Sequence, residues 1–215
     1  MPLHVLGLQI GVVESLAGGA PYPEEFATAT RKVAAAGRLS IARDHLEGDQ
    51  QADLRNHGGP DKALLCYGIS HYGPWREELG LPELGPGGFG ENLTLDCTED
   101  DVAIGDRWRV GTAVCEVSQP RVPCWKQSAR WLRAHLTERM QETGRTGWYL
   151  RVIEEGEVWP MAEVEVMARP WPEYTVRRCN QALFGALDAG EARLLAACPA
   201  LAARWRDQLL RRVGG

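Results

Sequence analysis

The sequence SQPRVPCWK, residues 118–126, joins a predicted strand to a predicted helix. Its two prolines fix φ and lack an amide donor, so this joint is expected to be stiff and irregular. Cys124 lies at the start of the helix, with Arg121 before it and Lys126 after it. A thiol near a helix N-terminus and close to cations is expected to have a lowered pKa, which makes it a nucleophile or a soft metal ligand. The alternative is a buried structural cysteine, because most free cysteines are inert core residues.

On either side of this joint, short apolar segments alternate with loops rich in glycine and proline, such as 16–25. Strands are predicted over 5–13, 38–42, 63–67, 93–95, 108–117, 148–153 and 158–166. Helices are predicted over 70–79 and 128–143. Many short strands with few helices between them are typical of a closed or nearly closed barrel. The predicted fold class is therefore mainly β, a β-barrel with peripheral helices.

The pattern changes after RPWP, residues 169–172, where three short helical segments follow. Thr175 and Asp188 fit the N-caps of the first two, and Pro199 fits the first turn of the third. Three short helices can hardly bury enough surface alone, so they are expected to dock on the barrel. The predicted domains are a barrel over 1–168 and an all-α three-helix module over 169–215.

The charge of this module differs from that of the barrel. It holds eight arginines against four acidic residues, a net +4, so the remainder of the chain carries −9. Its apolar residues are expected to face the barrel. Six arginines are expected to stay in solvent, where they either form a plain solvated face or steer an acidic partner protein: Arg177, Arg178, Arg204, Arg206, Arg211 and Arg212.

The composition is that of an ordinary globular chain, with 215 residues, 44% hydrophobic and 25% charged. No apolar run approaches the length of a membrane span, and the first residues lack the basic and apolar regions of a secretory signal. The six cysteines form no CxxC pair, which favours reduced thiols over a disulfide framework or a structural zinc site. A cytoplasmic protein without direct nucleic-acid or membrane partners is expected.

A second candidate site is the turn NHGGPDK, residues 56–62. Its two glycines permit positive φ or close approach to a ligand, and His57 and Lys62 flank them. The turn therefore fits a contact to an anion or a cofactor. The alternative is a tight turn that only leads into the strand at 63–67.

Four motifs occur in order along the chain: HGGPDKA at 57–63, GFGENLT at 88–94, GD at 105–106 and QPRVPCWK at 119–126. Together they resemble the MOSC-domain proteins, named after the C-terminal domain of molybdenum-cofactor sulfurase. The motif GRTGWY at 144–149 and the three-helix tail resemble the bacterial YiiM subgroup, linked to N-hydroxylaminopurine resistance.

The resemblance implies a MOSC β-barrel that binds the molybdenum cofactor and reduces N-hydroxylated compounds such as hydroxylaminopurine. It implies that Cys124 handles sulfur or binds molybdenum. It also assigns the family's motif lysine to Lys32, by its distance to Gly48-Asp49. The sequence VAAA at 33–36 departs from the proline-containing stretch expected after that lysine.

These implied roles agree with the chemistry of the side chains. A cofactor phosphate requires cations and backbone donors, molybdenum requires a soft thiolate, and a histidine with an ordinary pKa can transfer a proton. The predicted catalytic residues are Cys124, also the molybdenum ligand, and His57. Glu91 is a second, weaker acid candidate. The predicted cofactor contacts are Lys32, Gly58, Gly59, Lys62, Asn92 and Arg121.

Three functions stay open on the sequence. The first is a molybdenum-cofactor-dependent reductase with a small N-hydroxylated substrate and an electron-donor protein, since no flavin, NAD or Fe–S motif is visible. The second is a non-catalytic cofactor carrier or sulfur-transfer module that carries a Cys124 persulfide. The third is a cysteine hydrolase that uses His57 with Asp61 or Glu91.

Overall fold

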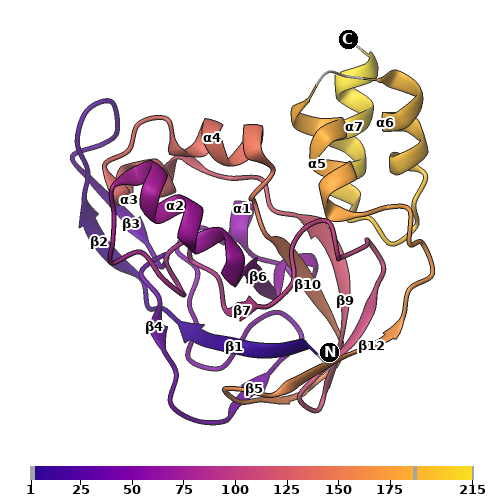
Figure 1. Cartoon of the computed structure of the whole chain (residues 1–215), viewed down its shortest axis with the longest axis horizontal. Coiled ribbons are helices and arrows are strands. Elements are labelled where there is room, and N and C mark those ends of the chain that lie inside the picture. Colours follow the sequence, from indigo (N-terminus) through magenta and orange to yellow (C-terminus); the bar gives the residue numbers. More distant parts are fainter. Residues whose placement is uncertain (1–2, 186–187, 215) are drawn as a thin grey trace.

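The computed structural model describes residues 3–185 and 188–214, and its centre is a closed β-barrel (Figure 1). The ring runs β1, β7, β6, β10, β9, β8, β12 and back to β1. Their bounds in that order are Leu3–Ile10, Leu93–Leu95, Leu64–Gly68, Trp148–Glu154, Ala113–Pro120, Arg107–Val110 and Glu163–Ala168. Neighbouring strands are antiparallel except for the parallel pair β6 and β7. The predicted β-barrel class is confirmed.

Bulky side chains fill the barrel interior, as expected where alternate residues of every strand point inward. Trp108 and Trp148 pack edge to face with ring centroids 6.2 Å apart. Leu64, Leu93 and Leu150 beside them are fully buried. Each such side chain contributes about 1.5–3 kcal/mol on burial, so the barrel is a packed core and not an open channel.

Smaller strand pairs extend from the barrel. β2 (Glu14–Ala17) and β3 (Glu25–Thr28) form a hairpin, β5 (Leu39–Ile41) pairs with β11 (Gly156–Val158), and β4 (Val33–Ala34) pairs with β1. The predicted loop at 16–25 thus overlaps both strands of the first hairpin. Pairing between these strands outweighs the glycine and proline content, which is confined to the turn.

The strand predicted over 108–117 is in fact two strands, β8 and β9. They are joined by a turn in which Gly111 has φ +62°. A glycine adopts this left-handed backbone without a steric penalty, so the chain reverses there instead of continuing.

The helix predicted over 128–143 is also two elements, α3 (Trp125–Trp131) and α4 (Leu136–Thr143). The break is at Leu132, which adopts φ +51° and ends α3. Gly144 ends α4 with φ +66°, as the sequence indicates. Both helices lie with α2 (Tyr72–Leu79) on one flank of the barrel, over a small second core that includes Trp75 and Phe89 (Figure 1).

The three-helix module consists of α5 (Val176–Phe184), α6 (Ala189–Ala196) and α7 (Ala203–Gly214). The side chains of Thr175 and Asp188 accept the expected capping hydrogen bonds. Pro199 is not at the start of the third helix, because α7 begins only at Ala203.

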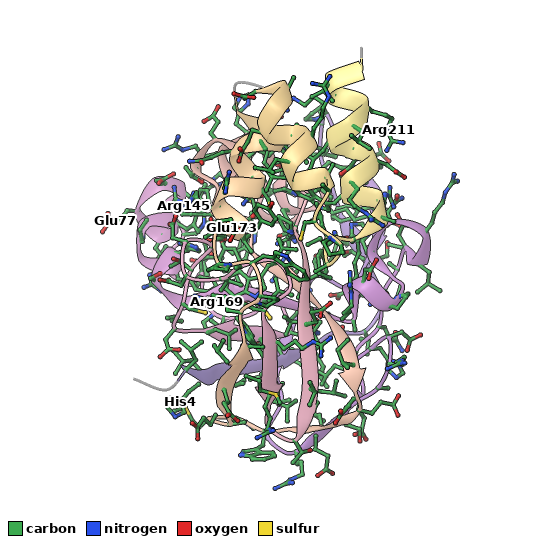
Figure 2. The ribbon with its side chains drawn as sticks, turned by 90° about the vertical axis from the view of Figure 1, so that its right-hand side faces the viewer. His4, Glu77, Arg145, Arg169, Glu173 and Arg211 are labelled. Carbon is green, nitrogen blue, oxygen red and sulfur yellow. The ribbon has the colours of Figure 1, made fainter. Side chains whose placement is uncertain are left out.

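The module docks on one end of the barrel, as expected (Figure 2). The amide of Ala202 donates to the Ser118 carbonyl of β9 at 2.9 Å. Trp205 and Leu209 are buried in the same core as the barrel strands. The end of the barrel and the module therefore share one apolar core.

The expectation that six module arginines stay in solvent is wrong for three of them, because Arg177, Arg178 and Arg206 are half-buried. Arg177 pairs with Asp100 at 3.2 Å, and Arg178 pairs with Glu191. Arg211 is exposed on α7 (Figure 2). Within the described residues, no helix is both long enough and apolar enough to cross a membrane.

Candidate functional site

Two cavities meet at Cys124. The first, here the barrel cavity, has about 580 Å³ including its open mouth, and Lys32, Asn92 and Arg121 line it. The second, here the α7 cavity, has about 800 Å³ including its open mouth and is lined on one side by Arg204 and other residues of α7. Six residues line both cavities: Asp53, His57, Lys62, Cys124, Lys126 and Tyr149.

Cys124 is the accessible thiol of this protein. It is partly exposed, whereas the other five cysteines, all within the described residues, are buried. Cys124 directly precedes α3, and its backbone is extended, with φ −116° and ψ 156°. Its carbonyl accepts from the Gln127 amide at 3.1 Å and from the Thr137 hydroxyl at 3.2 Å, so the backbone that carries the thiol is fixed.

Burial raises the pKa of each of the other thiols, which keeps them protonated at neutral pH. They are, in chain order, Cys66, Cys97, Cys115, Cys179 and Cys198. The structural alternative from the sequence, a buried inert cysteine, therefore describes these five and not Cys124.

His57 ends α1 (Leu54–His57), a single turn that Asp53 caps by accepting from the Asn56 amide at 3.1 Å. Burial and the Arg121 guanidinium lower the pKa of His57 from 6.5 to about 4, although the Asp53 carboxylate opposes the shift. The imidazole is therefore neutral at pH 7, with one nitrogen able to donate and one able to accept. The predicted near-neutral pKa of His57 is therefore wrong.

Arg121 supplies an unused cation to the barrel cavity. The residue is 4% exposed, and its Nη1 has no hydrogen-bond partner among the described residues. A buried donor without a partner costs about 1–3 kcal/mol, more when it is charged. A bound anion would remove this cost.

Lys32 lies in the same cavity, but a carboxylate engages it. Its ammonium pairs with Asp49, and both side chains are 5% exposed. Burial lowers the pKa of Lys32, and Asp49 opposes that shift. Asn92 donates to the other oxygen of Asp49 at 2.9 Å and accepts from the Leu65 amide at 3.0 Å. Lys32, Asp49 and Asn92 thus form one fixed wall. No role in the site was predicted for Asp49 from the sequence.

Lys62 lines both cavities, whereas the neighbouring glycines line neither. The Lys62 ammonium donates to the Asn56 carbonyl and lies 5.7 Å from the centre of the Tyr149 ring. Burial lowers the pKa of Lys62. Gly58 packs against the Leu54 carbonyl, and Gly59 adopts φ +97° in the turn that follows α1. Four residues of the predicted anion site line the barrel cavity together, namely Lys32, His57, Lys62 and Arg121. The two glycines do not line it.

Glu91 is not available as an acid. It is fully buried and accepts four hydrogen bonds, from the hydroxyls of Tyr72 and Thr94 and from the amides of Gly87 and Phe89. It holds the loop before β7 and lines neither cavity.

Asp61 is likewise engaged elsewhere, since it pairs with Arg151 at 2.8 Å. Neither carboxylate of the hydrolase hypothesis therefore lies beside Cys124 and His57 in the two cavities. The carboxylate that pairs with His57 is that of Asp53, which lies 3.8 Å from the ring Nδ1.

The donor set fits a pterin cofactor that brings its own metal ligands. Among residues 3–185 and 188–214, no group of three or more histidine, cysteine or acidic side chains could hold a bare metal ion. A dithiolene supplies two sulfurs, so one protein thiolate such as Cys124 completes a soft set. The unused Arg121 guanidinium then suits the anionic part of the cofactor.

Sequence reasoning missed the residues that α7 contributes to the site, Arg204, Trp205 and Gln208. No local signal marks them, because they lie on an ordinary amphipathic helix. The Asp53 cap is different, since an acidic residue three positions before Asn56 is a recognisable N-cap pattern.

Two family profiles match the chain. The MOSC domain matches residues 53–165, and the YiiM-like, 3-alpha helix domain matches residues 175–214. The protein YflK of Bacillus subtilis is 41% identical over 178 residues, which cover 82% of this chain and 79% of that one.

Two further comparisons extend this result. A protein of Gibberella moniliformis named Reductase is 37% identical over 133 residues, covering 60% of this chain but only 24% of that protein. The crystal structure of YiiM from Geobacillus stearothermophilus superimposes with a TM-score of 0.82 at 29% identity, covering 99% of this chain and 100% of that one.

Proposed function

Because this chain belongs to the MOSC-domain family, in its YiiM-like branch, we propose that it is a molybdenum-cofactor-dependent reductase of N-hydroxylated compounds. The family is associated with binding of the molybdenum cofactor and with reductase-type function. The observation that carries the proposal is the meeting of two cavities at Cys124, with neutral His57 and the unused Arg121 beside it. We assign the cofactor to one cavity and the substrate to the other.

The barrel cavity is the proposed cofactor site. Arg121, with Lys62 at the cavity's edge, would hold the anionic part of the cofactor, and the Cys124 thiolate would complete the metal's ligands. The wall of Lys32, Asp49 and Asn92 would orient it by hydrogen bonds. When bound, the cofactor supplies two-electron redox chemistry. A separate protein is the proposed electron donor.

His57 is the proposed proton carrier. Reduction of an N-hydroxyl group takes up two electrons and two protons, breaks the N–O bond and releases water. The leaving oxygen needs a proton, and His57 lines both cavities, so it can hold one there. A cofactor phosphate close to His57 would raise its pKa from about 4 toward neutrality, which would equip it to donate.

A carrier or sulfur-transfer module is the alternative, with a Cys124 persulfide. Such a protein has no need for a second cavity beside the thiol or for a proton carrier lining both. These two features support the reductase over the carrier.

The test uses the full chain purified from cells that make the cofactor. Bound molybdenum is measured by mass spectrometry, and conversion of hydroxylaminopurine to adenine is followed with a chemical reductant. Cys124→Ser should lose turnover while staying folded, since the change is nearly isosteric. The same change at Cys198, which lines neither cavity, is the control. Stoichiometric molybdenum without turnover would favour the carrier, and protein without molybdenum would end both the reductase and the cofactor carrier.

A further inference from the structure

Resting on the proposed function, we infer that the α7 cavity is the substrate site and that Arg204 binds an anionic group of the substrate. The chain would then prefer a planar nitrogen heterocycle that carries a phosphate, such as an N-hydroxylated purine nucleoside monophosphate, over the neutral base. The three-helix module would thereby set the specificity of the barrel's chemistry.

The two cavities share six lining residues and differ in the others. Arg121 lines only the barrel cavity, and Arg204 lines only the α7 cavity, with Cys124 and His57 common to both. Each cavity therefore has an arginine that the other lacks. The cofactor phosphate is assigned to Arg121, which leaves Arg204 for a second molecule.

The cations of the α7 cavity are not neutralised. Arg204 donates to the side-chain oxygen of Asn56 at 2.8 Å and to the Arg55 carbonyl at 3.2 Å, both uncharged acceptors. Lys62 and Lys126 likewise donate to carbonyls. Among the described residues, none of these three cations has a carboxylate within 4 Å.

Several arginines elsewhere on the protein surface are paired with a carboxylate. Arg107, Arg109, Arg139 and Arg151, for example, each contact a carboxylate. Asp53 is the one acidic residue among the described residues that line the α7 cavity. Because Lys62, Lys126 and Arg204 also line it, the cavity has a surplus of positive charge. Such a site attracts anions and favours a phosphate over a neutral group.

The walls of the α7 cavity also suit a planar ring. Trp125 stacks on Tyr22, with ring centroids 5.7 Å apart and 13° between the planes, yet stays 39% exposed. On the α7 side, the Trp205 indole N–H and the Gln208 side-chain oxygen are buried without partners among the described residues. Both residues line the α7 cavity.

This wall is held in place by the docked module. Ala202, directly before α7, bonds to β9, and Trp205 is 1% exposed in the shared core. Arg204 links α7 to the helix that carries His57, through Asn56. Arg204 therefore also contributes to the docking of α7, and the test must separate that contribution from anion binding.

The first experiment measures binding to the cofactor-free full chain by calorimetry, with adenosine monophosphate and adenosine as probes. The monophosphate should bind more tightly. Arg204→Gln should weaken its binding roughly tenfold, the scale of one charged hydrogen bond, and leave adenosine binding unchanged. Arg211→Gln, on the same helix but outside both cavities, is the matched control and should change neither. Equal losses for both probes, or no loss for either, would overturn the inference.

The second experiment uses the molybdenum-loaded enzyme. Arg204→Gln should raise KM for the N-hydroxylated monophosphate roughly tenfold, by a larger factor than KM for hydroxylaminopurine, and leave the molybdenum content unchanged. A fall in molybdenum content would place Arg204 in the cofactor site and refute the inference. If the wild-type enzyme reduces neither substrate but the binding results hold, the proposed function fails while the anion subsite stands.

Discussion

At Cys124, the feature that separates this thiol from the other five is access to solvent. The proposed cofactor requires a thiolate that it can reach, and burial excludes each of the other cysteines from that role. Because Cys124 precedes a helix and its carbonyl is bonded to Gln127 and Thr137, the thiol is presented from a rigid backbone.

Cys124 should be the first thiol alkylated at pH 7, by roughly tenfold or more, because reactivity follows exposure and thiolate content. Treatment with iodoacetamide followed by peptide mapping measures this. Earlier labelling of Cys66 or Cys179 would place the reactive thiol elsewhere.

His57 shows how neighbours set the state of a residue. Its ring titrates near pH 4 because burial and Arg121 disfavour the imidazolium. Arg121→Gln should therefore raise the pKa of His57 part of the way back to 6.5, and an imidazole NMR titration measures this. Arg109→Gln, which removes a paired surface cation, is the control. An unchanged His57 pKa in Arg121→Gln would contradict the assigned cause.

The same shift links His57 to stability. The unfolded chain takes up a proton at His57 as pH falls below 6.5, whereas the folded chain does so only near 4. The contribution of His57 to folding is thus complete above pH 6.5 and is lost as pH falls toward 4. A bound phosphate should raise the pKa of His57 in the folded chain, so that this contribution depends on pH over a narrower range.

At the scale of elements, the break between α3 and α4 decides the shape of the site. The apolar spacing over 128–143 is continuous, yet Leu132 turns left-handed and Ser128 and Thr137 bond across the break at 2.8 Å. α3 can therefore present Cys124 at the cavities, while α4 packs against the second core through Leu136 and Met140.

Leu132→Gly should stabilise the protein by about 0.5–1 kcal/mol, because Leu132 holds φ +51° and is 67% exposed. Denaturant unfolding measures the change. Leu132→Ala keeps the backbone penalty and should give no such gain. A loss of stability in the glycine variant would show that the leucine side chain contributes more than the backbone strain costs.

At the scale of the whole molecule, the three-helix module is part of the site. It buries Trp205 and Leu209 against the barrel and closes one side of the α7 cavity. The outer face of α7, with Arg211 and Arg212 exposed, is the surface proposed to steer an acidic electron donor.

Replacing both Arg211 and Arg212 by Gln should spare the fold and slow turnover with the donor protein more at low salt than at high salt, because salt already screens the attraction. Turnover with a small chemical reductant should not change. Equal losses with both electron sources would refute docking of the donor at α7.

The sequence by itself determined the barrel class, the helical tail and the position of Cys124 at a helix start, because strand alternation, turns and caps are local signals. Thr175, Asp188 and Gly144 acted as expected for this reason. The motifs also indicated the family, since their order along the chain does not depend on the fold.

Only the tertiary structure decided which residues share the site. Pairing of β10 with both β9 and β6 places Tyr149 opposite Gln119 and Leu65, so that the walls of the two cavities come from distant parts of the chain. The bond between Arg204 and Asn56 joins residues 148 positions apart. The lowered pKa of His57 and the pairing of Lys32 with Asp49 likewise depend on burial and on neighbours that only folding supplies. Local patterns carry no information on such contacts, because side chains meet through the register of strands and the docking of helices.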